Sequence, residues 1–185
     1  DWQGDFEARY PKDYADPANL SELAAWLKST DQSAATGDKL TVNRTFDGVL
    51  YTTDTAAYRL AKFKSEFAQH FEKDAVLFYY LFTELFLMVD SRAKNMFPTF
   101  MAGSKWFSLP YDFDTAIGIN NEGALVFSYN LEDIDHTESG ADIYNGQQSV
   151  LWINVRAAFF EDIKAMYQKL RSNGTLSFPV TEQRF

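Results

Sequence analysis

The chain has 185 residues, of which 46% are hydrophobic and 17% aromatic, and it contains no cysteine. This length and composition predict one domain over residues 1–185 with an aromatic core, and they exclude wholesale disorder. The formal net charge of −9 disfavours nucleic acid as a partner. The lack of cysteine excludes disulfides, thiolate metal sites and thiol nucleophiles, and leaves His70 and His136 as the available imidazoles.

Two helices are predicted in the first part of the chain, separated by a polar connection. Asp16 and Pro17 precede apolar residues at helical spacing, which predicts a first helix ending near Ser29. Residues 31–48 are polar and contain glycine, so we expect a long surface loop there. A second helix is expected after residues 52–54, with an apolar stripe made of Tyr58, Leu60, Phe63, Phe67 and Phe71.

The middle of the chain contains its most apolar segment. Residues 74–90 predict a third helix, capped by Asp74, that is apolar nearly all round and is therefore buried on most sides. Its longest apolar run is interrupted by Glu84 and is shorter than the roughly 20 residues that a membrane span requires. Two β-like runs, 96–101 and 105–114, are expected to pair as a hairpin.

The last part of the chain predicts a loop followed by one long helix. Residues 118–148 have little periodicity and are expected to form loop with at most one short strand, at 124–129. The final helix is expected to begin at Ser149 and to end before Asn173, which is followed by glycine. The predicted fold class is α+β, mostly helical, with one central β-hairpin.

Oxygen donors gather in the sequence around the exit of the third predicted helix. Asp90 ends that helix, Asn95 follows it, and Asp112 and Asp114 lie in the second β-run, where alternation would aim both carboxylates the same way. Such donors suit Mg²⁺ (or Mn²⁺), which proteins usually hold with one or two carboxylates and the phosphates of a nucleotide. The pattern therefore predicts phosphoryl transfer, with Asp90 as the base and Asn95 and Asp112 as metal ligands.

The spacing D-x₄-N followed by D-F-x resembles the catalytic loop and metal-binding motif of protein kinases. Residues 105–118, KWFSLPYDFDTAIG, are similar to the signature of one atypical group, the CotH-like spore-coat kinases. The segment FEARYP at residues 6–11 and the helix opening SVLW at residues 149–152 resemble flanking parts of the same family. The resemblance extends from about Phe6 to Arg171.

The resemblance implies a fold, a reaction and roles for four residues. The fold is a protein-kinase-like large lobe whose hairpin carries the metal-binding motif. The reaction is transfer of the γ-phosphoryl group of ATP to a protein hydroxyl with Mg²⁺ or Mn²⁺. By position, Asp90 is the catalytic aspartate, Asn95 and Asp112 bind the metal and its nucleotide, and Asp114 is a further metal ligand.

Two departures from the kinase pattern limit what the resemblance implies. Met88 and Val89 replace the His-Arg pair that precedes the catalytic aspartate, so control by a phosphorylated activation loop is not expected. The sequence contains no glycine-rich loop and no strand bearing a nucleotide-binding lysine. We therefore expect the small, nucleotide-clamping lobe to be missing upstream, and these 185 residues to bind ATP weakly.

Two other functions remain open at this level. The chain could be a catalytically silent structural or adaptor module that binds an assembly partner in a spore coat or phage particle. It could also be a carboxylate-based metal hydrolase that needs no nucleotide. No signal peptide is visible in the sequence, so the expected location is the cytoplasm, a bacterial spore coat or a phage particle.

Overall fold

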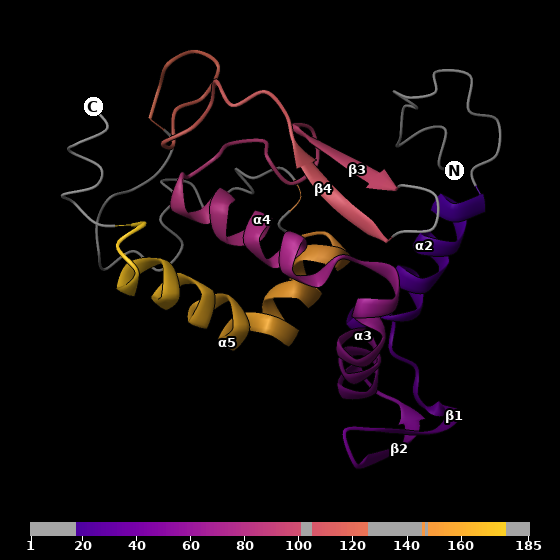
Figure 1. Ribbon diagram of the computed structural model, residues 1–185. Coiled ribbons are helices and arrows are strands. Elements are labelled where there is room, and N and C mark those ends of the chain that lie inside the picture. Colours follow the sequence, from indigo (N-terminus) through magenta and orange to yellow (C-terminus); the bar gives the residue numbers. More distant parts are fainter. Residues whose placement is uncertain (1–17, 101–104, 126–145, 147, 177–185) are drawn as a thin grey trace. The chain divides into compact units, whose positions relative to one another are not determined.

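The computed structural model describes residues 18–100, 105–125, 146 and 148–176 (Figure 1). The α+β class is confirmed, because helices occur together with two small antiparallel sheets. The chain divides into two compact units, residues 1–66 and 67–185. The elements in chain order are α2 (Ala18–Ser29), η1 (Gln32–Ala34), β1 (Gly37–Phe46), β2 (Val49–Asp54), α3 (Ala56–His70), α4 (Lys73–Leu85), β3 (Met96–Phe100), β4 (Trp106–Pro110) and α5 (Val150–Ser172).

The loop predicted over residues 31–48 is wrong, because most of this segment belongs to a β-hairpin. β1 and β2 pair antiparallel up to the closing pair Phe46 and Val49. Asp47 and Gly48 form the two-residue turn between them with φ values of 48° and 79°, as a type I′ turn requires. The Asp-Gly pair is a hairpin signal, but β1 is almost wholly exposed and therefore lacks an alternating apolar pattern.

Aromatic packing joins α2 to the first part of α3 in the first unit. Trp26 stacks on Phe63 with ring centroids 5.3 Å apart, and its indole N–H donates to Glu66 Oε2 at 2.9 Å. Trp26 and Phe63 are 8% and 0% exposed, so the predicted aromatic stripe of α3 does face a core. The hydrogen bond satisfies the one polar group of the buried indole.

A buried ion pair lies where β2 meets α3. Arg59 donates from Nε and Nη2 to the two carboxylate oxygens of Asp54, both at 2.7 Å, and Thr36 donates to the same carboxylate from its backbone N–H. Arg59 also donates to the carbonyl oxygens of Asp31 and Lys28. The hydrogen bonds from Arg59 hold the pKa of the Asp54 carboxyl well below its ordinary value, although burial opposes this shift.

The second unit is built on α4, which contacts α5 and β4. The predicted pairing of the two β-runs is confirmed in part: β3 and β4 pair antiparallel from Met96 and Pro110 to Phe100 and Trp106, whereas residues 111–114 lie beyond the strand. The predicted start of α4 is slightly too late, because Glu72 is its N-cap residue. The most buried hydrophobic side chains in the described part of this unit are those of Phe67, Val76, Leu77, Trp152, Val155 and Phe159.

The third predicted helix extends too far toward the C-terminus. α4 ends at Leu85 because Leu87 adopts a left-handed conformation with φ 44°. The N–H groups of Leu87 and Met88 then donate to the carbonyls of Glu84 and Thr83 at 3.3 and 3.1 Å. This is a Schellman motif, in which glycine usually occupies the left-handed position. Since leucine occupies it here, the sequence carries no stop signal.

The final helix agrees with its predicted limits. The Ser149 side chain accepts a hydrogen bond from the N–H of Trp152, and Asn173 is the C-cap residue of α5. The helix is kinked at Phe159. No helix among the described residues is long and apolar enough to cross a membrane. Most of the predicted loop at 118–148, including His136 and the strand beyond residue 125, lies outside the described residues.

Candidate functional site

The segment that leaves α4 and the segment that follows β4 are joined by hydrogen bonds. Ile117 N–H donates to the carbonyl of Phe86 at 2.5 Å. Val89 N–H donates to the carbonyl of Thr115 at 3.3 Å, and the Thr115 hydroxyl donates back to the carbonyl of Val89 at 2.9 Å. The two segments are more than 20 residues apart in sequence, so tertiary packing alone brings them together.

Asn95 links the Asp90 turn to Asp112. Its backbone N–H donates to the carbonyl of Asp90 at 2.9 Å, and its side-chain Nδ2 donates to the carbonyl of Asp112 at 3.3 Å. Tyr111 N–H donates to the carbonyl of Asn95 at 3.0 Å. The structure thus brings together Asp90, Asn95 and Asp112, three residues that the sequence assigns to one site.

Asp90 carries a partly exposed carboxylate. Its side chain is 22% exposed, and Lys94 Nζ lies 3.5 Å from Oδ2. Lys94 is itself 67% exposed, so this surface pair contributes little to stability. The carboxylate is therefore held near a cation and remains accessible to a substrate group.

Asp112 and Asp114 are exposed, but they are not related by strand geometry. β4 ends at Pro110, and Asp112 has a φ of 55°, so the alternation expected over residues 105–114 stops before the two aspartates. The prediction that alternation aims both carboxylates the same way is therefore wrong. The strand has ended before Asp112, and residues 115 and 117 bond to the segment that follows α4.

The side-chain oxygens of Asp90, Asn95 and Asp112 belong to the chemical type that Mg²⁺ prefers. Because Asn95 uses Nδ2 toward Asp112, its side-chain oxygen is the atom left to bind a metal. One amide oxygen with one or two carboxylates is a donor set that Mg²⁺ uses when phosphates complete the coordination. In the part of the chain that the structure describes, no three His, Cys, Asp or Glu side chains are grouped to hold a metal ion.

Left-handed backbone is concentrated at this site. Four non-glycine residues with positive φ lie on the two joined segments: Leu87, Asp90, Asp112 and Ile117, at 44°, 60°, 55° and 63°. Aspartate tolerates this region, whereas a β-branched residue does not. Residues held in such conformations cost about 1–3 kcal/mol each and cluster at functional sites. The strain is an observation in favour of function at this position.

We expect Ile117→Gly to stabilise the second unit by about 1 kcal/mol, because it relieves left-handed strain at a side chain that is 61% exposed. Ile119→Gly is the matched control. Ile119 lies two residues on, outside the left-handed region, and pairs with Leu125 in an isolated bridge, so glycine there should destabilise. Urea unfolding followed by circular dichroism measures both changes. Equal destabilisation by the two variants would show that residue 117 is not strained.

The sequence does not predict which buried residues bond to the backbone of the Asp90 turn. The Tyr79 hydroxyl donates to the carbonyl of Ser91, and burial raises the pKa of that hydroxyl. Trp152, a buried residue of α5, donates from Nε1 to the carbonyl of Arg92 at 2.9 Å. A buried tyrosine or tryptophan needs a partner for its polar group, but the sequence does not say which one.

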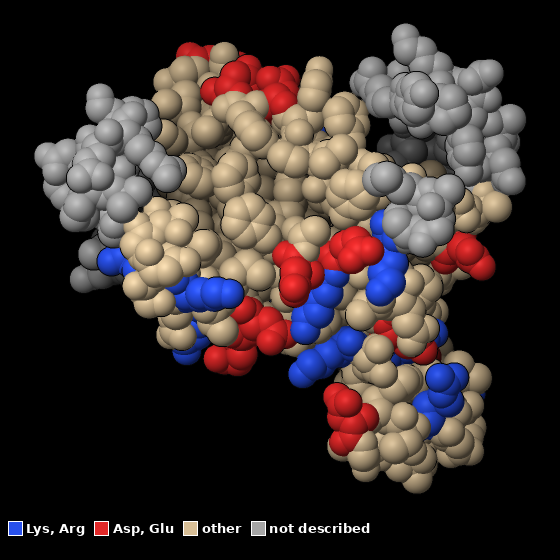
Figure 2. Space-filling view, viewed as in Figure 1, with Lys and Arg blue, Asp and Glu red and all other residues tan. Residues whose placement is uncertain are grey.

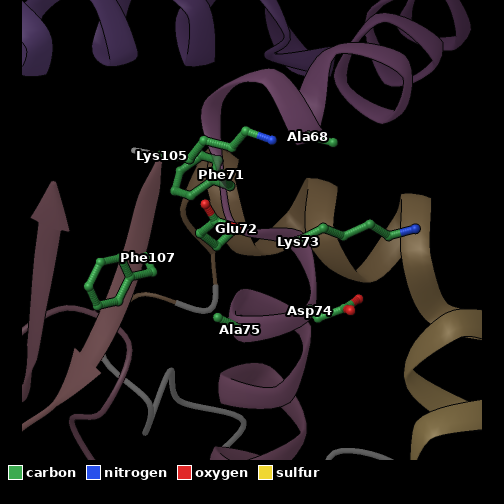
Figure 3. A pocket seen from close by; sticks show the side chains of 8 residues that line it. All are labelled: Ala68, Phe71, Glu72, Lys73, Asp74, Ala75, Lys105 and Phe107. Carbon is green, nitrogen blue, oxygen red and sulfur yellow. The ribbon is translucent and has the colours of Figure 1, made fainter. Parts of the chain in front are cut away.

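The described part of the second unit also contains an open hollow of about 610 Å³, at the start of α4 and β4 (Figure 3). None of the predicted site residues lines it. Its charged groups are Glu72, Lys73, Asp74 and Lys105, which balance one another. Lys73 is already paired with Asp162 at 3.0 Å. The hollow therefore has no clear preference for an anionic ligand such as a nucleotide.

A comparison with protein-family models finds no family that matches this chain, and searches of curated proteins and of solved structures likewise find no significant match.

Proposed function

We propose that the chain is the large lobe of an atypical, CotH-like kinase that transfers the γ-phosphoryl group of ATP to a protein hydroxyl. The observation that supports the proposal is the junction made by Asn95, which bonds to the carbonyls of Asp90 and Asp112 at once. The motif resemblance requires these residues to meet. The proximity of Asn95 to Asp112 follows from the register of the β3–β4 hairpin, in which Met96 pairs with Pro110.

In this proposal the oxygen of the acceptor hydroxyl bonds to the γ-phosphorus, and Asp90 accepts the proton that the hydroxyl loses. The bond from the γ-phosphorus to its bridging oxygen breaks, and ADP leaves. Asn95 and Asp112 would hold Mg²⁺, with Asp114 as a further ligand, and the ion would neutralise charge on the phosphates. The partial exposure of Asp90 suits a group that must meet an incoming hydroxyl.

Mn²⁺ binding tests the metal ligands. We expect the protein to bind Mn²⁺, as seen by electron paramagnetic resonance, and Asp112→Asn to weaken binding by more than about tenfold. Asparagine tolerates the left-handed backbone at this position. The fold is therefore expected to survive. Asp74→Asn, at an exposed aspartate in the first turn of α4, is the control and should bind like the parent protein.

The reaction itself is tested by transfer of labelled phosphate from ATP to casein in the presence of Mg²⁺. The assay uses the protein together with any natural upstream region. Transfer that disappears when Mg²⁺ is chelated supports the proposal. Mn²⁺ binding without transfer to any acceptor would contradict the kinase hypothesis and favour a metal site of another kind.

A silent structural or adaptor module is the second candidate, and exposed aromatic side chains favour it. Phe78, Phe86 and Phe113 are 48%, 41% and 43% exposed, and the face of α4 drawn in Figure 2 carries mainly uncharged side chains. Large exposed apolar residues that occur together often mark protein-binding surfaces. Loss of partner binding after Phe78→Ser, in a protein that binds no Mn²⁺, would favour this candidate.

A further inference from the structure

Arg92 is a buried cation two residues after Asp90. It is 3% exposed and donates from Nε and Nη2 to the hydroxyl of Thr83 at 3.3 and 3.0 Å. Nη2 also donates to Glu84 Oε1 at 2.5 Å, and the guanidinium lies 4.2 Å from the ring centroid of Tyr80. The side chain thus fastens the Asp90 turn to the last two turns of α4.

The carbonyl group of Arg92 is bound by the start of α5. Trp152 Nε1 donates to it at 2.9 Å. Gly146 approaches the same group so closely that a Cβ at this position would lie 2.6 Å from the Arg92 oxygen. Substitution there would force the turn to move. Arg92 is therefore clamped by its side chain to one helix and by its backbone to another.

We propose that Arg92 is the positioning residue for Asp90 and Asn95. The inference rests on the proposed function. Asp90 and Asn95 flank Arg92 in a single turn that is closed by the Asn95 N–H to Asp90 carbonyl bond, so fixing residue 92 fixes the direction of both side chains. Groups that act on a transferring phosphoryl must be placed within a fraction of an ångström.

Ser91 provides an internal contrast. It lies in the same turn and is 1% exposed, as buried as Arg92. Its hydroxyl has no hydrogen-bond partner among the residues that the structure describes, so removing it leaves none of their polar groups unsatisfied. Ser91→Ala is therefore expected to be neutral or slightly stabilising, by up to about 1 kcal/mol. Comparing variants of Ser91 and Arg92 therefore distinguishes a position that is only buried from one that positions the turn.

Arg92→Met is the test variant, because methionine fills the volume and Glu84, with a side chain 40% exposed, can be solvated when its partner is removed. We expect the NMR signals of the Asn95 side-chain amide to shift toward solvent values and to exchange faster. We also expect the affinity for Mn²⁺ to fall by about 10–100-fold, as on loss of a residue that orients metal ligands. Ser91→Ala should change neither readout.

Trp152→Phe is a second variant, which removes the indole donor to the Arg92 carbonyl together with part of the buried ring. It keeps an aromatic ring in the core. It can therefore be measured even if Arg92→Met does not fold. In Trp152→Phe we expect the NMR signals of the Asn95 side-chain amide to shift in the same direction as in Arg92→Met, but by less. Unchanged Asn95 amide signals in every variant that folds would overturn the inference. If the parent protein binds no Mn²⁺, the proposed metal site fails separately, since the amide signals still report on position.

Discussion

Asp90→Asn is expected to reduce phosphoryl transfer to a protein acceptor by about 10³-fold, the scale of a lost general base. The substitution keeps the size of the side chain, and asparagine tolerates the left-handed backbone that Asp90 adopts. The amide cannot accept the proton of the acceptor hydroxyl. The KM for ATP should stay within a few-fold, because the proposed role of Asp90 concerns the acceptor.

The measurement is a steady-state assay in which ATP and acceptor are varied separately. Asp74→Asn serves as the control for loss of one negative charge elsewhere in the same unit. A far-ultraviolet circular dichroism spectrum and a melting temperature matched to the parent protein exclude unfolding as the cause. Transfer at the parent rate by Asp90→Asn would remove the central residue of the proposed mechanism.

Asp54→Ala is expected to lower the free energy of unfolding of the first unit by about 3–5 kcal/mol. Asp54 is 2% exposed and is the carboxylate partner of Arg59. Its removal leaves a cation, itself 12% exposed, without its charged acceptor. The loss should appear in urea titrations followed through the NMR signal of the Trp26 indole N–H, which belongs to the same unit. Asp38→Ala, at an exposed residue of β1, should change stability by less than about 0.5 kcal/mol.

The same ion pair predicts acid sensitivity of the first unit. The folded-state pKa of Asp54 is lowered, first by its hydrogen bonds to Arg59. Its contribution to stability is therefore complete above the unfolded pKa of about 3.9 and is lost as the pH falls through and below that value. Asp54→Ala should flatten the dependence of stability on pH below about pH 5. An unchanged acid slope in this variant would show that other carboxylates cause it.

The two leading predictions concern residues of different compact units. Asp54 and Trp26 lie in the unit formed by residues 1–66, whereas Asp90 and Arg92 lie in the unit formed by residues 67–185. Effects of variants at such distant positions, which share no side-chain partner among the described residues, are expected to add. The prediction of a single domain over the whole chain stays a prediction, as does the kinase-like lobe.

The sequence alone determined the elements in which apolar residues recur at a regular spacing and in which a capping or turn residue marks the end. The hairpin of β3 and β4, the start of α5 at Ser149 and its end at Asn173 all follow from neighbouring residues. The oxygen donors of the candidate site are also visible in the sequence, because Asp90 and Asn95 share one turn.

Tertiary structure decided what depends on contacts between distant residues. The stop of α4 relies on Leu87 in a conformation normally left to glycine, and the β1–β2 hairpin lacks a buried alternating face. Asn95 reaches Asp112 across 17 positions, and Trp152 reaches Arg92 across 60. Side-chain periodicity records which face of an element is buried, but it does not record which distant group will satisfy a given donor.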